Sequence, residues 1–248
     1  MIKYKKIHHE NELKKVIRLG KEIWGFSEAE SMPYHTLVTI LHSGGIIFGA
    51  FLNEIPIGYS IATVALKDEY ALYLYMLGVT KKYTSQGVAQ ELFKKNEVYA
   101  MKKNIKSIYW SFNPLDSRAA NLYLHKLNAV IDQPIVYNMY GLDSNLLPSD
   151  RFIARLNLSQ EKDKSIHNKT LPKNTKIDHS LLNQTNDPIM DRHHDIAVEF
   201  PYCLQNMDMK EFINRFRKLF TRYLKNYIIV DFIRLKDKRK CYYILNGL

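Results

Sequence analysis

The sequence predicts an α/β fold of the α+β type, with a mixed, mostly antiparallel central sheet and a C-terminal α+β annex. Three apolar segments separated by short polar turns follow one another between residues 46 and 79, which is typical of an antiparallel meander. A helix and a strand then alternate, which predicts a right-handed crossover onto the same sheet. The chain has 248 residues, enough for one domain and an annex.

The elements before the meander are expected to be one strand and two helices. Residues 2–8 can form a short strand, and Asn11 then stands where a helix cap would be. The segment that follows, ELKKVIRLGKEIW, places apolar residues near one helical face. A second helix is expected over 32–43, with Pro33 in its first turn.

The meander and crossover follow in order. Strands are expected at 46–51, 55–66 and 70–79. Residues 87–103 predict an amphipathic helix, and 107–112 predict a strand. Asp116 can cap a further helix that runs to about Leu127. The last strand of this half is expected over 129–140.

The C-terminal part contains a change in composition. Residues 151–158 predict one more strand, whereas 159–195 are rich in Lys, Asn, Asp, Ser and Thr. Low apolar content gives little burial to offset ordering entropy, so this excursion is expected to be mobile. Beyond it, a short strand, a helix and two strands are expected at 196–200, 208–225, 227–233 and 240–245.

The charge and the cysteine count limit the function classes. The net charge of +11 indicates a lysine-rich surface or an anionic partner. No helix-turn-helix, zinc-finger or RNP-like motif accompanies the lysines, so nucleic acid is not expected as a partner. Two cysteines are too few for a disulfide framework or a cysteine metal site. With neither a bilayer-spanning run nor a secretory signal in view, we expect a cytoplasmic protein.

The most informative segment is MLGVTKKYTSQGVAQELF at 76–93. A strand ends there, a polar loop turns, and a helix starts at a glycine. Such a junction directs backbone N–H groups and the positive end of the helix dipole into one space, where an anion can bind. Gly87 lets the backbone approach a ligand closely. An ordinary strand-to-helix turn explains the same residues, so both interpretations remain open here.

This segment resembles the GNAT superfamily of N-acyltransferases. In that family a strand ends in a hydrophobic-Val pair, then come a loop of the form R/Q-x-x-G-x-G/A and a helix. Matching positions are Leu77, Val79, Gln86, Gly87, Val88 and Ala89. The chain departs from the family pattern at Thr84, where Arg or Gln is preferred, and at Ser85, where glycine is frequent. Ala89 stands where a final glycine is common.

A second block, at 107–156, resembles one GNAT subgroup. It contains W-x-F-x-P-L-x-x-R from Trp110 to Arg118, then K-L-x-A-V, N-x-Y-G and L-P-x-D-R-F. Some members of this subgroup are associated with N-acylamino acid racemases and act as N-succinyltransferases on amino acids. The resemblance extends over nearly the whole chain outside the excursion. It implies an acyl-CoA-binding domain, a connecting strand segment, the polar excursion and the annex at 1–141, 142–158, 159–195 and 196–248.

The resemblance implies transfer of an acetyl or succinyl group from acyl-CoA to a small amine or amino acid. Acetyl-CoA or another acyl-CoA is the expected co-substrate, with no metal and no membrane partner. A non-catalytic acyl-CoA sensor and an acyltransferase for protein or tRNA are the alternatives. The sequence does not distinguish a monomer from a homodimer.

The resemblance also implies site residues. A bulge in the last meander strand splays it from its neighbour, and Gly78 is consistent with that bulge. The residues expected to bind the cofactor are Leu77, Gly78, Val79, Thr84, Ser85, Gln86, Gly87, Val88, Ala89, Asn113 and Asn121. Those expected to bind the acceptor are Trp24, Tyr34, His35 and Arg118.

Three tyrosines are candidates for proton transfer. The family's acidic tyrosine position is Leu124 here, and Tyr123 is displaced from it by one residue. Tyr73 and Tyr75 alternate along their strand and are expected to share a sheet face. A core position explains Tyr123 equally well, and surface positions explain His35 and Arg118.

Overall fold

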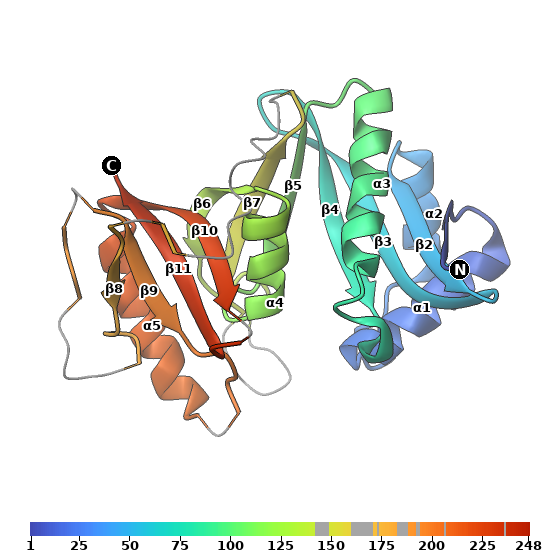
Figure 1. The fold of residues 1–248 in the computed structure, drawn as a ribbon. Helices are drawn as coiled ribbons and strands as arrows, with labels where there is room; N and C mark the ends of the chain where they lie inside the picture. Colours follow the sequence, from blue (N-terminus) through green and yellow to red (C-terminus); the bar gives the residue numbers. More distant parts are fainter. Residues whose placement is uncertain are drawn as a thin grey trace. The chain divides into compact units, whose positions relative to one another are not determined.

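The chain is described from a computed structural model at residues 1–141, 149–159, 171–172, 174–182, 188–191, 194–205, 207–235 and 237–248. It forms two compact units (Figure 1). The first unit comprises residues 1–110 and a short segment that begins at Asn157. The second unit comprises the other described residues from Ser111 onward. None of the described helices is long and apolar enough to cross a membrane.

The first unit is built on a mixed sheet with the order β1-β2-β3-β4-β5. The strands are β1 (Lys3–Lys6), β2 (Ile46–Leu52), β3 (Ile55–Leu66), β4 (Tyr70–Val79) and β5 (Ser107–Phe112). Each of the first four is antiparallel to its neighbour, whereas β5 is parallel to β4. The predicted meander and the predicted α+β class with a mixed sheet are therefore confirmed.

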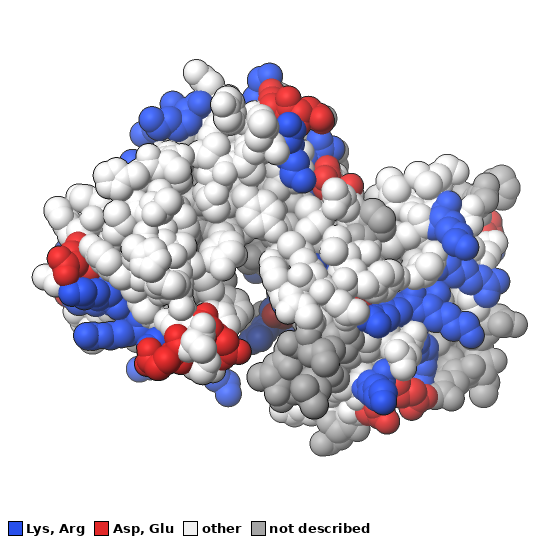
Figure 2. Space-filling model, turned by 180° about the vertical axis from the view of Figure 1, so that it is seen from behind, with Lys and Arg blue, Asp and Glu red and all other residues white. Residues whose placement is uncertain are grey.

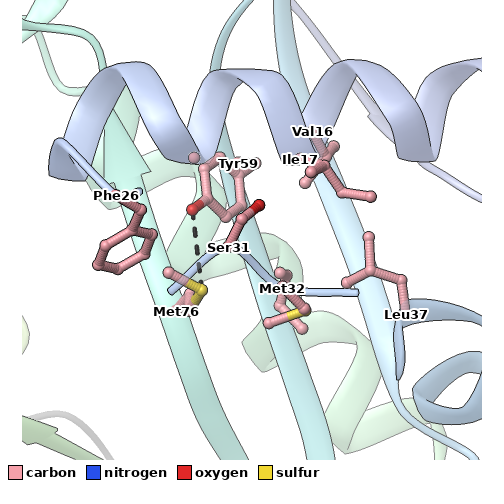
Figure 3. Close-up of a pocket in the computed structure, with 10 residues that line it drawn as sticks. Val16, Ile17, Phe26, Ser31, Met32, Leu37, Tyr59 and Met76 are labelled. Carbon is pink, nitrogen blue, oxygen red and sulfur yellow. Dashed lines mark hydrogen bonds between the residues drawn. The ribbon is translucent and has the colours of Figure 1, made fainter. Parts of the chain in front are cut away.

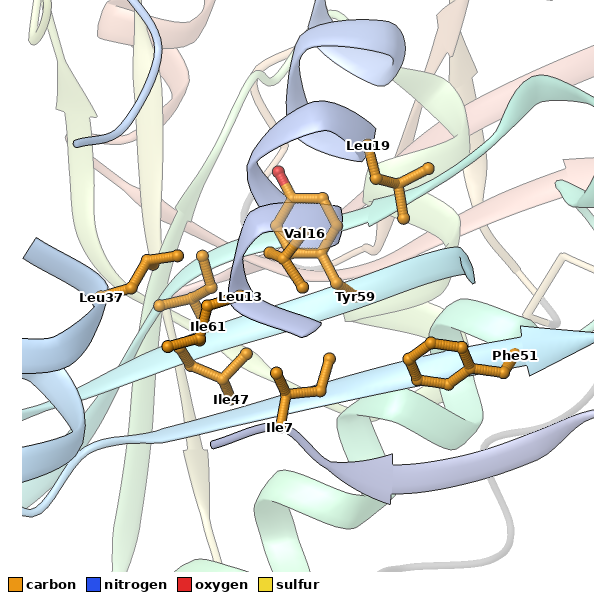
Figure 4. Close-up of a cluster of buried hydrophobic side chains, with 9 residues drawn as sticks. All are labelled: Ile7, Leu13, Val16, Leu19, Leu37, Ile47, Phe51, Tyr59 and Ile61. Atoms are coloured by element: carbon orange, nitrogen blue, oxygen red, sulfur yellow. The ribbon is translucent and has the colours of Figure 1, made fainter. Parts of the chain in front are cut away.

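Helices cover both faces of this sheet. On one face, α1 (Glu10–Trp24) and α2 (Tyr34–His42) pack on β2 and β3. Figure 4 shows this core, in which Leu13 and Val16 of α1 and Leu37 of α2 surround Tyr59 and Ile61 of β3. On the other face, α3 (Val88–Lys102) lies across the sheet, and its buried Asn96 donates a hydrogen bond to Ser60 Oγ at 2.8 Å.

Two predicted helix starts differ from the structure. α1 begins at Glu10 with His9 at the N-cap, so Asn11 lies inside the helix and not at its cap. The earlier start places both Glu10 and Glu12 in the first turn, where carboxylates interact favourably with the helix dipole. Pro33 is the N-cap of α2 and precedes the first turn.

The second unit begins with a helical segment after β5. Asp116 caps α4 (Ser117–Ala120) by accepting hydrogen bonds from the N–H groups of Arg118 and Ala119, as predicted. The helix then continues as a π-helical turn, η2 (Asn121–Lys126), in place of the regular helix expected to Leu127. The wider turn changes which residues share a face, because a π-helix has a longer hydrogen-bonded repeat than an α-helix.

The remaining elements of the second unit are a pair of strands, a four-stranded sheet and one helix. β6 (Val130–Val136) pairs antiparallel with β7 (Arg151–Asn157), and β6 is shorter than the predicted strand over 129–140. The second sheet has the order β10-β11-β9-β8, where β8 is Lys176–Asp178, β9 Ile196–Phe200, β10 Tyr227–Leu235 and β11 Lys240–Gly247. α5 (Met209–Tyr223) is capped by Asp208.

An aromatic core holds the second unit together. Phe216 and Phe220 of α5 stack with ring centroids 4.2 Å apart. Both contact the buried ring of Tyr243 on β11, which also meets Phe200 and Phe232 edge-on. Aromatic rings supply large buried area per residue, so this compact cluster can stabilise a unit of modest size.

Part of the predicted excursion at 159–195 is ordered. β8 pairs in parallel with β9, and the carboxylate of buried Asp178 accepts hydrogen bonds from Tyr223 and from the N–H groups of Ser180 and Ile189. The predicted mobility of 159–195 stays a prediction, and residues 160–170, 173, 183–187 and 192–193 of this segment lie outside the described residues. The domain boundary expected at residue 141 stays a prediction, while the compact units divide within β5.

Candidate functional site

The junction of β4 and α3 has the geometry of an anion-binding turn. β4 ends at Val79, a 3₁₀ turn covers Lys81–Tyr83, and α3 begins after Gly87, whose φ is 83°. No side chain caps this helix start, and the bond from Glu91 N–H to the Gly87 carbonyl is the first of the helix. The N–H groups before Glu91 therefore point out of the helix end together with the positive end of its dipole. A side chain added at Gly87 would meet open space.

Two side chains of this turn donate hydrogen bonds to carbonyl groups of the same turn. Thr84 Oγ1 donates to the Lys81 carbonyl at 2.9 Å, and Gln86 Nε2 donates to the Lys82 carbonyl at 3.0 Å. Ser85 has a φ of 63°, a left-handed conformation that glycine adopts more readily. The backbone at Ser85 thus has a conformation that a glycine would adopt more readily.

β4 and β5 pair over only part of their length. The pairs are Leu72 with Ile108 and Tyr73 with Tyr109, although β4 continues to Val79. Among the described residues no later pair joins the two strands. The edge of β4 from Leu74 onward, including the predicted Leu77, Gly78 and Val79, thus lies beyond the last pair with β5.

The bulge in β4 lies at Tyr75 and not at Gly78. The register with β3 joins Ile61 to Met76 and Ala62 to Leu74, which leaves Tyr75 as the extra residue. Gly78 pairs regularly with Tyr59, and a Cβ there would lie 3.3–3.4 Å from Ile23 and Trp24. Glycine at 78 is therefore explained by close packing of α1 on the sheet.

The bulge also interrupts the alternation expected for the two strand tyrosines. Tyr73 is half-buried and precedes the bulge, whereas Tyr75 is 52% exposed at the bulge itself. The bulge interrupts the two-residue alternation of side chains between Tyr73 and Tyr75. Their spacing therefore no longer implies that they lie on the same face of the sheet.

A hollow lies on the α1–α2 face of the sheet, next to the bulge (Figure 3). It is open to solvent, and its unfilled space, the open mouth included, is about 260 Å³. Its walls include Val16, Ile17, Phe26, Met32, Leu37 and Met76. The Tyr59 hydroxyl lies in it, accepts a hydrogen bond from Trp24 Nε1 at 3.0 Å and donates to Met76 Sδ at 3.8 Å. Burial raises the pKa of Tyr59 to about 12, so this phenol stays protonated at neutral pH.

The predicted acceptor residues of the first unit lie differently around this hollow. Trp24 is 47% exposed and contacts Tyr59 through the hydrogen bond above. Tyr34 and His35 are exposed at the start of α2 and do not line the hollow. Tyr59, Met32 and Met76 do line it, and sequence reasoning missed them. In the sequence these residues show only an apolar or aromatic character. Core residues share that character, so no sequence signal marked these three as site residues.

The other predicted residues belong to the second unit. Asn113 Oδ1 accepts from Leu115 N–H in a local turn, and Asn121 Nδ2 donates to the Phe232 carbonyl. Arg118 is exposed and lies 3.6 Å from its neighbour Asp116. Tyr123 is buried against Phe112, and burial raises its pKa well above the ordinary value, with a further contribution from Asp116. These contacts support local packing roles.

Basic side chains are spread over the surface. Figure 2 shows Lys and Arg in several groups on one face, some of them beside acidic side chains. Exposed ion pairs such as Lys94 with Glu91 and Lys106 with Glu69 account for part of this pattern. Surface pairs of this kind contribute little to stability.

The family model described as acetyltransferase (GNAT) family matches residues 13–128. No curated protein matches the sequence. Among solved structures, the ribosomal-protein-S18-alanine N-acetyltransferase from Escherichia coli is 16% identical, with a TM-score of 0.54 over 66% of this chain and 98% of its own. An N-acetyltransferase from Staphylococcus aureus Mu50 is 14% identical, with a TM-score of 0.54 over 64% and 99%.

A third similar structure is Arabidopsis thaliana Naa50 in complex with the bisubstrate analogue CoA-Ac-MVNAL. It is 16% identical, with a TM-score of 0.51 over 63% of this chain and 98% of its own. At these identities the likeness concerns the fold. The match covers almost the whole length of each of these three structures, but only about two thirds of this chain.

Proposed function

We propose that this protein is an acyl-CoA-dependent N-acyltransferase. Its chain has the GNAT fold, and residues 13–128 match the family model described as acetyltransferase (GNAT) family. The observation that carries the proposal is the β4–α3 junction, where an uncapped helix start follows Gly87. An uncapped start offers backbone N–H donors to the pyrophosphate of coenzyme A. The edge of β4 beyond Tyr73, which β5 leaves unpaired, offers further backbone groups to the pantetheine arm.

The residues of the turn fit this ligand. Gly87 leaves open space over the helix start, and the bonds of Thr84 and Gln86 to the turn carbonyls fix the loop. Coenzyme A, when bound, supplies the acyl group as a thioester. The chain's part is to hold that thioester along β4 and to place the amine against it.

The proposed reaction makes one bond and breaks one. The amine nitrogen attacks the thioester carbonyl carbon, the C–N bond forms, and the C–S bond breaks. The amine loses a proton and the departing thiolate gains one, so an amide and free CoA result. Backbone N–H groups along the β4 edge can stabilise the carbonyl oxygen as charge develops.

Tyr75 is the tyrosine best placed to move a proton. It is exposed at the bulge, beside the edge of β4 that would face the acyl group. Tyr123 is buried, and its raised pKa makes it a poorer acid toward a thiolate. Tyr73 precedes the bulge, inside the paired part of β4.

An acetyl or succinyl donor and an amino-acid or small-amine acceptor remain part of the proposal. The resemblance of residues 107–156 to acyltransferases associated with N-acylamino acid racemases supports an amino-acid acceptor. The test is a thiol-release screen of acetyl- and succinyl-CoA against pooled amino acids, amines and peptides. Release that depends on an acceptor is expected. Binding of CoA without any release would instead identify a non-catalytic sensor.

A further inference from the structure

The solvent-facing side of α5 carries positive charge without acidic partners. Lys218 and Arg222 lie one helical turn apart and are both exposed, and Lys225 follows just after the helix. Among the described residues, no ion pair involves any of these three side chains. The one acidic residue of the helix, Glu211, is paired with Arg215 at 2.9 Å. Such a row of cations attracts an anionic partner.

Local interactions do not account for this row. On α3, in contrast, exposed Lys94 is paired with Glu91 at 2.8 Å. The helix dipole favours Arg222, which lies in the last turn of α5, but it does not favour Lys218 one turn earlier. Like charges four residues apart weaken a helix slightly, so the pair does not stabilise α5.

Two exposed tyrosine rings lie in the turn after β6, beside this side of α5. Tyr137 is 44% exposed, its hydroxyl shares a hydrogen bond with Thr221 of α5, and the Arg217 guanidinium lies 5.2 Å from its ring centre. Tyr140 is 58% exposed, with the Arg151 guanidinium 5.3 Å from its ring centre. Each ring therefore offers exposed aromatic surface next to positive charge.

A hydrogen-bond network fixes the turn against α5. Arg217 donates to the Asp150 carboxylate through Nε at 2.7 Å and Nη2 at 2.6 Å, and to Asn138 Oδ1 at 3.1 Å. Asp150 also accepts from the Asn138 N–H at 3.1 Å. A two-pronged pair of this kind has a defined geometry. The rings and the cations thus keep set positions, which lowers the entropy lost when a ligand binds.

We propose that the exposed side of α5 and the turn after β6 bind a single-stranded nucleic acid. Lys218, Arg222 and Lys225 contact phosphates, and bases stack on Tyr137 and Tyr140. Cations that follow a backbone and aromatic rings that take bases are the combination by which proteins hold single strands. The surface forms no sequence motif, because its two parts lie far apart in the chain.

Other anionic partners fit this surface less well. Insertion into a bilayer requires an apolar helix face, and that of α5 is buried in the aromatic core through Phe216 and Phe220. An acidic protein segment would use the cations but not the rings. Both partners are therefore included as outcomes of the test.

Fluorescence anisotropy with the full chain tests the proposal. The probes are a labelled oligouridylate of roughly 12 nucleotides, within the usual site size, and the matching single-stranded DNA. A duplex of the same length, polyglutamate and vesicles of phosphatidylglycerol and phosphatidylcholine are compared. A single strand should bind at least about tenfold more tightly than these three, and log Kd should rise with log salt concentration by about 0.7 per contacted phosphate. Binding of the RNA, of the DNA or of both supports the proposal and identifies the source.

A pair of double variants tests the cations. Lys218→Gln with Arg222→Gln should weaken binding at least about tenfold and lower the salt slope by about 0.7 for each cation removed. Lys102→Gln with Lys103→Gln removes the same charge from the exposed end of α3 and should leave Kd nearly unchanged. All four positions are exposed, and circular dichroism checks that each variant is folded.

A pair of single variants tests the rings. Tyr140→Leu should weaken binding at least about fivefold, the usual contribution of one stacked base. Tyr140→Phe also loses the hydroxyl contact with Ser111 but keeps the ring, so it should bind like the parent. The difference between the two variants reports stacking alone.

Several results would overturn the proposal. These are no binding of either single strand at low salt, equal losses in the two double variants, or equal affinities of Tyr140→Leu and Tyr140→Phe. Binding of polyglutamate, duplex or vesicles as tight as that of the single strands would also overturn it and would identify the partner as an acidic protein, a double helix or a lipid surface. None of these measurements involves acyl transfer, so a negative result leaves the proposed function intact.

Discussion

Gly87 and Ser85 take left-handed backbone conformations in the same turn. Gly87 does so without cost, and Ser85 does so with a Cβ that disfavours it. The two residues together shape a loop whose N–H groups face outward. At the scale of single residues, the proposed activity depends on this backbone geometry and on one exposed phenol.

Gly87→Glu should weaken CoA binding at least tenfold, because its side chain and negative charge would occupy the open space over the helix start. Tenfold corresponds to about 1.4 kcal/mol, which calorimetry measures directly. Gly141→Glu is the matched control, since Gly141 also has a positive φ and open space at its Cβ. Equal CoA affinity in a folded Gly87→Glu protein would contradict the assignment of the turn.

Tyr75→Phe should lower kcat by about a hundredfold, the usual contribution of one positioned proton-transfer group. The ring is kept and only the hydroxyl is lost, so CoA affinity should stay level. Tyr73→Phe and Tyr123→Phe serve as controls and should retain kcat within about threefold. A large loss of kcat in Tyr123→Phe alone would transfer the role to that residue.

At the scale of elements, the close approach of α1 to the sheet shapes the hollow. Gly20 of α1 leaves room for the Tyr59 hydroxyl, which would lie 2.9 Å from a Cβ at that position. The next atom of the ring would lie at an ordinary 3.6 Å. Gly20 therefore lets α1 pack closely against the Tyr59 hydroxyl of β3.

Gly20→Ala should lower the free energy of unfolding by about 1–3 kcal/mol, because overpacking forces the helix or the ring to shift. Adding Tyr59→Phe removes the clashing oxygen and should recover part of that loss, even though Tyr59→Phe alone gives up the hydrogen bond from Trp24. Urea unfolding of both single variants and the double variant gives the coupling. Strictly additive effects would show that the contact is relaxed elsewhere.

At the scale of the whole molecule, the described residues form two compact units. The second unit is stabilised by its aromatic core and by Asp178, which links the chain around β8 to Tyr223 of α5. Three donors form hydrogen bonds to this buried carboxylate. Removing it would leave these buried donors without a partner, which lowers the free energy of unfolding.

Asp178→Ala should lower the stability of the second unit by about 1–3 kcal/mol and leave the first unit unaffected. Hydrogen exchange should show faster exchange in α5 and β9–β11, with protection in α1–α3 unchanged. Asp191→Ala is the control, since Asp191 is a more exposed ion-pair partner of Lys176, and it should change stability by less than about 1 kcal/mol. Uniform loss of protection in both units would show that they unfold together.

The sequence by itself determined the elements whose periodicity is strong. The meander at 46–79, the helix after Gly87, the cap at Asp116 and the GNAT resemblance all follow from local patterns that neighbouring residues express directly. Only the tertiary structure decided that the bulge lies at Tyr75, that the helix after Ala120 widens to a π-turn, and that Met32, Tyr59 and Met76 line one hollow. Those features depend on register between strands and on packing of α1 across them, which residues distant in sequence set together.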